Sequence, residues 1–431
     1  MRPIVRSILV ALLTMEARAV VRKYRPSIIA VTGSVGKTST KDAIYAALSS
    51  YASVRKSDKS FNSEIGIPLT ILGRPNAWEN PLRWIQNLLD GLALILFRMP
   101  YPQWLILEIG ADRPGDIRKV AAWLPVDIAV ITRLPEIPVH VEYFETPEEV
   151  VEEKASLISA LKPSGTLILY GDDARVRELS SRALEARTIT FGFSEHATIR
   201  GTRVEFIYSE GKPAGMRANI SAEGHSAEAR VSGTVGSHAF LPLLAAVAVA
   251  ASLDMPLGKA ITSLEENYRP APGRMHILSG LRGSTVIDDT YNASPAATVA
   301  ALETLASLNI PGRKIAALGD MLELGRFSVD EHRKLGALAA ESVDLLITVG
   351  FRARDIAQAA LDGGLTEKNI FQCEDSDEVG EMLSPLLSDG DCVLLKGSQS
   401  IRMEHAVESI MAYPEEAQKL LVRQEEEWQR R

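Results

Sequence analysis

Two periodicities alternate in the pattern of hydrophobic and polar positions along most of the chain. Continuous apolar, β-branched runs are typical of strands buried on both faces of a parallel sheet. Runs with a helical period separate them, such as Lys41–Leu48 and Pro147–Leu161. The strand-like runs in this part are Ser27–Val31, Leu105–Gly110, Asp127–Thr132 and Thr166–Tyr170. The alternation predicts a doubly wound α/β sheet.

The pattern changes between residues 195 and 232. Thr202–Tyr208 and Ala227–Val231 alternate as antiparallel strands do, so we expect such strands to flank the sheet. His238–Leu253 is rich in small residues and predicts a core helix. The proline-rich stretch Tyr268–Arg274 is typical of an interdomain linker.

A second series of strands and helices follows and predicts a smaller, Rossmann-like α/β domain. No G-x-G-x-x-G fingerprint follows its first strand. We expect an N-terminal apolar and basic helix (1–27), a central ATP-binding domain (28–270) and a C-terminal α/β domain (271–431). Glu415–Arg431 is interpreted as a solvated terminal helix. The predicted strands are Ser284–Asp288, Lys314–Leu318, Leu345–Val349 and Cys392–Lys396.

Two apolar segments raise the question of membrane contact. Ile4–Met15 is shorter than the roughly 20 residues that a membrane-spanning helix needs. Its helical pattern runs on to Lys23, which disfavours a cleaved signal peptide. Leu82–Met99 is interrupted by Asp90 and Gly91, so it is either a packed helix or a helix on the membrane surface. The sequence leaves both readings open.

Composition narrows the class of protein. The 431 residues are 46% hydrophobic and 24% charged, as in an ordinary globular chain. The net charge of −8 and the lack of a basic stripe argue against a nucleic-acid partner. Cys373 and Cys392 form no C-x-x-C pair, which disfavours a disulfide framework or a zinc site and suits a cytoplasmic location. If the apolar segments touch lipid, the protein would be peripheral at the inner membrane face.

A glycine loop lies between the first predicted strand and the first predicted helix. In Thr32-Gly-Ser-Val-Gly-Lys-Thr-Ser-Thr40, backbone N–H groups of a P-loop can surround phosphate oxygens. Lys37 can reach the β- and γ-phosphates, and the Thr38 hydroxyl can bind Mg²⁺. Val31 stands where the general motif has its first glycine. We expect an ATP site formed by Gly33, Ser34, Gly36, Lys37, Thr38 and Ser39.

Glu108 lies near the carboxyl end of an apolar strand. A carboxylate there costs free energy unless it is paired or bound to a metal. Ligands gather at the carboxyl ends of strands in open α/β sheets. We therefore expect Glu108 to be functional.

Several motifs together resemble the Mur ligase family. They are T-G-S-V-G-K-T-S-T, F-N-S-E-I-G-I-P-L-T, L-E-I-G-A-D-R-P-G-D-I, D-D-T-Y-N-A-S-P, L-G-D-M-L-E-L-G and K-G-S-Q-S-I-R-M-E, spread over residues 28–410. The nearest branch adds D-alanyl-D-alanine to a UDP-linked muramoyl-tripeptide. The resemblance implies ATP, two Mg²⁺ ions and an acyl phosphate made from a substrate carboxylate.

The resemblance also implies that Lys37, Glu108, His140 and Lys154 are catalytic groups and that Thr38 is a ligand. Lys37 and Thr38 would bind phosphate and the first Mg²⁺, and Glu108 matches a metal-binding glutamate. His140, in Val139-His-Val-Glu142, matches a ligand to a second Mg²⁺. Lys154 stands where the family has a carbamylated lysine, and a carbamate supplies the oxygen ligands that Mg²⁺ prefers.

In the C-terminal part, the implied roles are binding ones. Asp289, Tyr291 and Asn292 match a loop that approaches the nucleotide. The residues that the resemblance assigns to the substrates are Asn62, Arg274, Lys396, Ser398 and Arg402.

Two departures from the family pattern affect recognition. Members that act on UDP-muramoyl substrates carry an N-terminal UDP-binding domain, and we expect that none fits into the roughly 27 residues before the P-loop strand. Ala239 replaces an asparagine that contacts adenine, although His238 can still lie beside the base.

We therefore expect an ATP-dependent amide-bond ligase that adds D-alanyl-D-alanine in peptidoglycan precursor synthesis. Its partners would be small molecules: a muramoyl-peptide-like acceptor and an amino acid or dipeptide. The alternatives are a ligase of the same type with an acceptor not linked to UDP, such as a poly-amino-acid or cofactor precursor, and a non-catalytic ATP-binding module.

Overall fold

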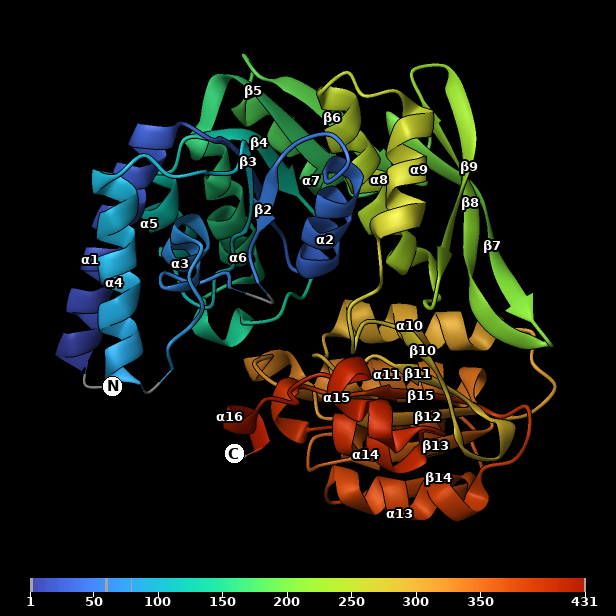
Figure 1. Ribbon diagram of the computed structural model, residues 1–431. Coiled ribbons are helices and arrows are strands. Elements are labelled where there is room, and N and C mark those ends of the chain that lie inside the picture. The colour runs from blue at the N-terminus through green and yellow to red at the C-terminus, as the bar shows by residue number, and fades with distance from the viewer. Residues whose placement is uncertain (1–2, 59–60, 79, 430–431) are drawn as a thin grey trace.

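The computed structural model describes residues 3–58, 61–78 and 80–429. Residues 1–2 of the predicted N-terminal helix, residues 59–60 and 79 of the predicted central domain and residues 430–431 of the predicted C-terminal domain lie outside the described residues. Two separate sheets, each covered by helices, lie one above the other in Figure 1. The predicted linker Tyr268–Arg274 joins them, between α9 (Leu257–Asn267) and β10 (His276–Ser279).

The first sheet has nine strands in the order β2-β3-β1-β4-β5-β6-β7-β8-β9. Neighbours are parallel from β2 to β7, and β7, β8 and β9 pair antiparallel, which confirms the predicted change of pattern after residue 195. Their bounds are β1 Ser27–Thr32, β2 Val54–Lys56, β3 Trp104–Glu108, β4 Val126–Ile131, β5 Leu161–Tyr170, β6 Arg187–Gly192, β7 Ile199–Ser209, β8 Lys212–Ala222 and β9 His225–Ser232.

Strand β1 shows why its sequence is apolar throughout. Ile28 and Ala30 belong to the hydrophobic core on one face of the sheet, and Ile29 and Val31 to the core on the other. Both faces are therefore covered, as expected for a parallel sheet. One core includes α1 (Pro3–Tyr24), α3 (Gly66–Leu72), α4 (Pro81–Leu96) and α5 (Asp116–Ala121), and the other includes α2 (Lys37–Leu48), α8 (Ser237–Ser252) and α9.

The segment after β4 differs in detail from the prediction. The helix expected over Pro147–Leu161 ends earlier, as α6 (Pro147–Ala155), and continues as a 3₁₀ helix over Ser156–Ala160. Strand β5 starts at Leu161, five residues before the predicted start. The short helix α7 (Ala174–Glu178) follows it.

The second sheet has the order β10-β11-β15-β12-β13-β14, with β10 antiparallel and the rest parallel. Sequence analysis missed its two edge strands, which have four residues each. The strands are β11 Thr285–Asp288, β12 Lys314–Gly319, β13 Leu345–Val349, β14 Ile370–Cys373 and β15 Cys392–Lys396; the helices are α10 Pro295–Ser307, α11 Ser328–Ser342, α12 Arg354–Asp362, α13 Ser376–Leu386 and α14 Glu404–Ile410.

The C-terminal tail is not the solvated helix that we expected. It consists of two short helices, α15 (Ala417–Leu420) and α16 (Glu426–Gln429). Leu421 joins the core of the second sheet, and buried Arg423 donates to Glu404 Oε1 at 3.0 Å and to the Thr290 carbonyl at 2.7 Å. The many charged residues of the tail suggested exposure to solvent, but Arg423 is buried because the Glu404 carboxylate is its partner.

Candidate active site

The glycine loop has a backbone that only glycine adopts readily. Gly33 has φ +142° and Gly36 has φ +85°. A β-carbon at Gly33 would lie 1.9 Å from Thr132 Oγ1, so the loop packs tightly against the end of β4. Backbone N–H groups of Ser34 and Val35 donate to the Arg133 carbonyl, which fixes the loop there.

Lys37 begins α2 and folds back over the loop. Its ammonium donates to the Gly33 carbonyl at 2.9 Å. Burial lowers the pKa of Lys37, and the charges of Glu108 and Asp112 oppose this shift. An anionic phosphate at this helix N-terminus would stabilise the charged amine further.

Glu108 ends β3 and is buried with polar neighbours. Its Oε1 accepts from Asn62 Nδ2 at 3.2 Å, and its Oε2 lies 3.8 Å from Lys41 Nζ. Among the described residues, Oε2 has no hydrogen-bond partner although it is buried. A buried oxygen without a donor is what a metal ligand would leave when the metal is removed. Asn62, predicted to bind substrate, thus contacts a predicted metal ligand.

His140 lies between the two sheet units. Its Nδ1 is 2.7 Å from Glu323 Oε2, in the loop after β12, and its Nε2 is 3.6 Å from Asp112 Oδ1. His140 has φ +67°, a left-handed conformation that is uncommon for a residue with a side chain. The imidazole therefore points at acidic groups on both sides.

Lys154 is a buried lysine on α6 with 1% of its surface exposed. Burial, aided by the nearby charge of Lys37, lowers its pKa to about 7. The adjacent Glu153 carboxylate accepts from backbone N–H groups at the start of α5, at 2.7 Å for Ile117. A lysine with this pKa is largely neutral just above pH 7, which is the form that reacts with carbon dioxide.

The predicted metal ligands Thr38, Glu108, His140 and Lys154 include a hydroxyl and an amine. Within the described ranges, no group of three or more His, Cys, Asp or Glu side chains has a metal-binding arrangement. The buried Glu108 oxygen is a suitable ligand for Mg²⁺. Lys154 becomes one only if its neutral amine is converted to a carbamate, which supplies oxygen atoms.

A pocket opens beside the P-loop and is lined by residues of both sheet units. Ser34, Gly36 and Ser39 come from the loop and α2, and Asp289, Asn292 and Lys396 come from the second sheet. His238 and Arg274 also line it. The structure thus brings predicted nucleotide-binding and substrate-binding residues to one pocket.

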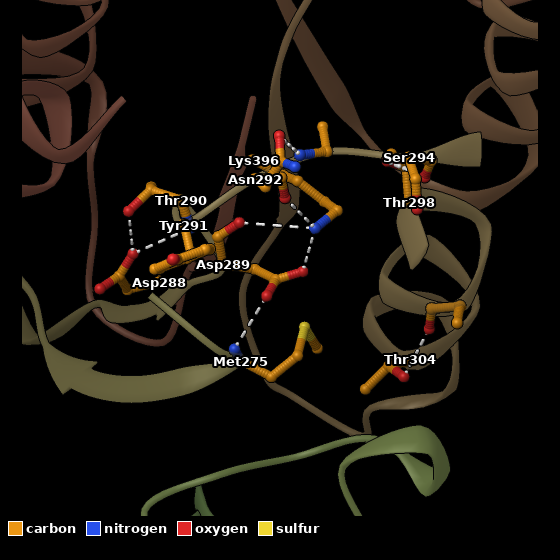
Figure 2. A network of polar contacts seen from close by, with 12 residues as sticks. Met275, Asp288, Asp289, Thr290, Tyr291, Asn292, Ser294, Thr298, Thr304 and Lys396 are labelled. Atoms are coloured by element: carbon orange, nitrogen blue, oxygen red, sulfur yellow. Dashed lines mark hydrogen bonds and ion pairs between the residues drawn. The ribbon is translucent and has the colours of Figure 1, made fainter. Parts of the chain in front are cut away.

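Lys396 organises the second-sheet side of this pocket (Figure 2). Its ammonium donates to Asp289 Oδ2 at 2.5 Å and to the Asn292 carbonyl at 2.9 Å. Asp289 Oδ1 accepts from the Met275 N–H at 3.1 Å. The buried ion pair therefore fixes the loop after β11 to the end of β15.

Arg274 and His238, which both line the pocket, have different neighbours. The Arg274 guanidinium carbon lies 3.9 Å from the centre of the Tyr291 ring, in a cation–π arrangement. Burial lowers the pKa of His238 to about 4, so its ring is neutral. His238 Nδ1 is buried and has no hydrogen-bond partner in the part of the chain that the structure describes.

Three predicted substrate residues lie outside the pocket lining: Asn62, which lies beside Glu108, and Ser398 and Arg402. Ser398 Oγ accepts from the Leu322 N–H at 2.8 Å. Arg402 donates from Nε to Glu404 Oε1 at 2.6 Å. Their substrate-binding roles stay predictions.

Sequence reasoning missed Lys41, Asp112 and Glu323, which contact or face the predicted catalytic groups. Lys41 carried a usable signal, because it falls four residues after Lys37 and so one turn further along the same helix.

Known proteins resemble this chain in sequence and structure. The family model described as "Mur ligase middle domain" matches residues 87–250, and "Mur ligase, glutamate ligase domain" matches 273–399. The UDP-N-acetylmuramoyl-tripeptide–D-alanyl-D-alanine ligase of Bacillus subtilis is 28% identical over 399 residues, covering 92% of this chain and 79% of the relative. The ligase of the same name from Escherichia coli is 26% identical, with the same coverage.

A crystal structure of the MurF ligase from Thermotoga maritima in complex with ADP aligns with a TM-score of 0.76 and 27% identity. The alignment covers 95% of this chain and 84% of that one.

Proposed function

The chain belongs to the Mur ligase family, and we propose that it joins D-alanyl-D-alanine to a muramoyl-tripeptide with ATP as the energy source. The observation that carries this proposal is the shared pocket. Residues of a P-loop and a buried Lys396–Asp289 pair line one cavity. An activating nucleotide and an incoming amine can therefore meet there.

The proposed reaction has two steps. An acceptor carboxylate oxygen attacks the γ-phosphorus, the bond to the β–γ bridging oxygen breaks, and ADP leaves. The dipeptide amine then attacks the acyl carbon and loses a proton, and phosphate departs with the former carboxylate oxygen. Lys37 would hold phosphate charge, and most of the rate enhancement would come from positioning and electrostatics.

We also propose that Thr38, Glu108, His140 and a carbamylated Lys154 hold two Mg²⁺ ions. Bound Mg²⁺ would neutralise phosphate charge at the site. The Glu108 oxygen without a donor and the lowered pKa of Lys154 support this assignment. Incubation with ¹³C-bicarbonate should give a carbamate NMR signal that is lost in Lys154→Ala. A carbamate signal that persists in Lys154→Ala would contradict the assignment.

His238 and Asn292 would contact the nucleotide within the pocket, and Tyr291 would approach it from beside Arg274. Arg274 and Lys396 would contact the substrates. The need for ATP favours a cytoplasmic reaction. Both cysteines are free and buried, as a reducing compartment allows.

The test is phosphate release from ATP with Mg²⁺, UDP-muramoyl-tripeptide and D-alanyl-D-alanine, each omitted in turn. We expect release only with all components, together with a pentapeptide product by mass. Phosphate release that is the same with and without the dipeptide would contradict the proposal. If a muramoyl-tripeptide without UDP replaces the UDP-linked one, the acceptor needs no nucleotide.

A further inference from the structure

Helices α1 and α4 expose an unusual amount of apolar surface at one edge of the molecule. They lie side by side in Figure 1, and both pack on the first sheet unit. Ile4 and Leu82 are each 75% exposed and Leu89 is 60% exposed. The exposed apolar side chains of the two helices and the following residues are Ile4, Val5, Ile8, Leu12, Met15, Leu82, Ile85, Leu89, Leu92, Leu96, Phe97 and Met99. We call this set the edge surface.

These side chains are not needed for the protein core. Leu9, Leu13 and Val20 of α1, and Trp84 and Leu94 of α4, already fill the buried faces of the two helices. Each helix therefore has an exposed apolar face in addition to its buried one. Contiguous apolar surface of this kind marks an interaction site, in contrast to scattered single residues.

The two exposed stripes face the same side of the helix pair. The helices run parallel, because Lys23 near the end of α1 donates to the Leu94 and Ile95 carbonyls near the end of α4. They approach closely at Glu16 and Gly91. At 3.6 residues per turn, the angle around the helix axis between this contact and the exposed stripe is about 80° on α1 and about 140° on α4. The two rotations have opposite senses, so both stripes face the same side of the pair. One continuous surface results.

The two segments that carry the edge surface have an excess of basic residues. Residues 3–24 and 81–99 carry six Arg and Lys side chains and only two acidic ones, although the whole chain has a net charge of −8. Arg18 and Arg22 continue the α1 stripe three and seven residues after Met15, and both are exposed. Of the two acidic residues, Asp90 pairs with Arg74 at 2.8 Å. Glu16 is buried, and burial raises its pKa to about 7.

We propose that the edge surface docks the protein on a bilayer that contains anionic phospholipids. Its apolar stripe would enter the boundary of the acyl chains, and Arg18 and Arg22 would meet lipid phosphates. In the described residues, no helix is long and apolar enough to cross a membrane. Because one face of α1 and of α4 packs in the core of the first sheet unit, both helices would lie along the bilayer surface. The proposal uses no residue of the ligase site and goes beyond the proposed function.

A second copy of the chain fits the edge surface less well. Its own edge surface would bring the same excess of cations to the interface, and like charges at an interface cost free energy. An anionic bilayer supplies the opposite charge over the whole surface. The charge pattern therefore favours lipid.

Flotation of the full chain with lipid vesicles tests the proposal. We expect binding to vesicles of phosphatidylglycerol and phosphatidylcholine, and at least tenfold weaker binding to phosphatidylcholine alone or at high salt. Ile8→Glu with Leu89→Glu should lower binding at least tenfold. Both positions are exposed, so the variant should fold, which circular dichroism can verify. Leu184→Glu, at a position that is 87% exposed outside the edge surface, is the matched control.

A second variant separates charge from apolar contact. Arg18→Gln with Arg22→Gln should lower binding to anionic vesicles at least tenfold and leave binding to neutral vesicles unchanged. Absence of flotation with anionic vesicles at low salt, or equal flotation of all variants, would overturn the proposal. So would a dimer in solution that Leu89→Glu dissociates. Phosphate release with soluble substrates should be the same in every variant, so a failure of the ligase proposal is recognised separately.

Discussion

The Glu323 carboxylate lies 2.7 Å from Nδ1 of His140 and so joins the two sheet units at the proposed metal site. Both residues have a left-handed backbone, with φ +67° at His140 and φ +62° at Glu323. Such a conformation costs roughly 1–2 kcal/mol for a residue with a side chain. The fold therefore holds two unfavourable conformations where these side chains meet.

We predict that Glu323→Gln weakens the use of Mg²⁺. A carboxylate that holds the second nitrogen of a ligating histidine fixes the orientation of the ring, and its loss typically reduces metal affinity or activity 10- to 100-fold. The Mg²⁺ concentration for half-maximal phosphate release should rise about tenfold. Glu341→Gln, on the exposed surface of α11, is the control. An unchanged Mg²⁺ dependence in Glu323→Gln would remove the positioning role.

Lys154 gives a prediction about pH and stability. Its folded-state pKa of about 7 lies below the unfolded value near 10.4, so the unfolded chain binds more protons between these values. The free energy of unfolding should therefore rise with pH from about 7 towards 10, as the penalty for a buried charge disappears. Lys154→Met should flatten this dependence, measured by urea unfolding from pH 6.5 to 9.5 in buffer without carbon dioxide.

The same variant should lack ligase activity, and bicarbonate should not restore it. Methionine fills a similar volume without a charge, so the variant should be at least as stable as the parent at pH 7. Activity close to the parental rate would contradict the carbamate proposal. A pH dependence of stability that is unchanged in Lys154→Met would contradict the pKa assignment.

The two P-loop glycines should respond differently to alanine. At Gly33, a β-carbon would lie 1.9 Å from Thr132 Oγ1 and 3.0 Å from Thr132 Cβ, whereas at Gly36 nothing lies within 4 Å. Gly36 has the left-handed conformation, which costs about 1–2 kcal/mol for alanine. Gly33, at φ +142°, has a backbone that residues with side chains rarely adopt. Gly33→Ala should therefore weaken ATP binding much more than Gly36→Ala, measured by calorimetry. The reverse order would show that the packing against Thr132 is unimportant.

Lys396→Met should be strongly destabilising, because it leaves the buried Asp289 carboxylate without its cation. Breaking a buried pair in this way typically costs about 3–5 kcal/mol. Met275 N–H would remain as a donor to Asp289. The double variant Asp289→Asn with Lys396→Met should recover part of the loss in urea unfolding. No recovery would mean that the two side chains are not coupled.

The sequence was sufficient for the parts of the fold that rest on local pattern. The apolar strands, the glycine loop and Glu108 carry their signals within a few residues. The four-residue strands β10 and β14 do not, because each has a single buried residue and pairs with a strand on one side only. The burial of the tail residue Arg423 likewise has no local signal, because it depends on the Glu404 carboxylate, which only the fold brings beside it.

The candidate site shows the same division. The family resemblance marked Lys37, His140 and Lys154 as candidates, but the contact of His140 with Glu323 joins residues that are 183 positions apart. The motif does not reveal that the Arg402 guanidinium donates to Glu404, and the substrate role of Arg402 stays a prediction. Local motifs predict which residues carry chemistry, and only the fold shows which partners they have.

The central claim is that the pocket activates a carboxylate as an acyl phosphate. The most direct test uses an acceptor whose terminal carboxylate is labelled with ¹⁸O, together with ATP, Mg²⁺ and D-alanyl-D-alanine. We predict that one labelled oxygen appears in the released phosphate for each amide bond formed. Unlabelled phosphate alongside amide product, or label in AMP, would contradict the claim.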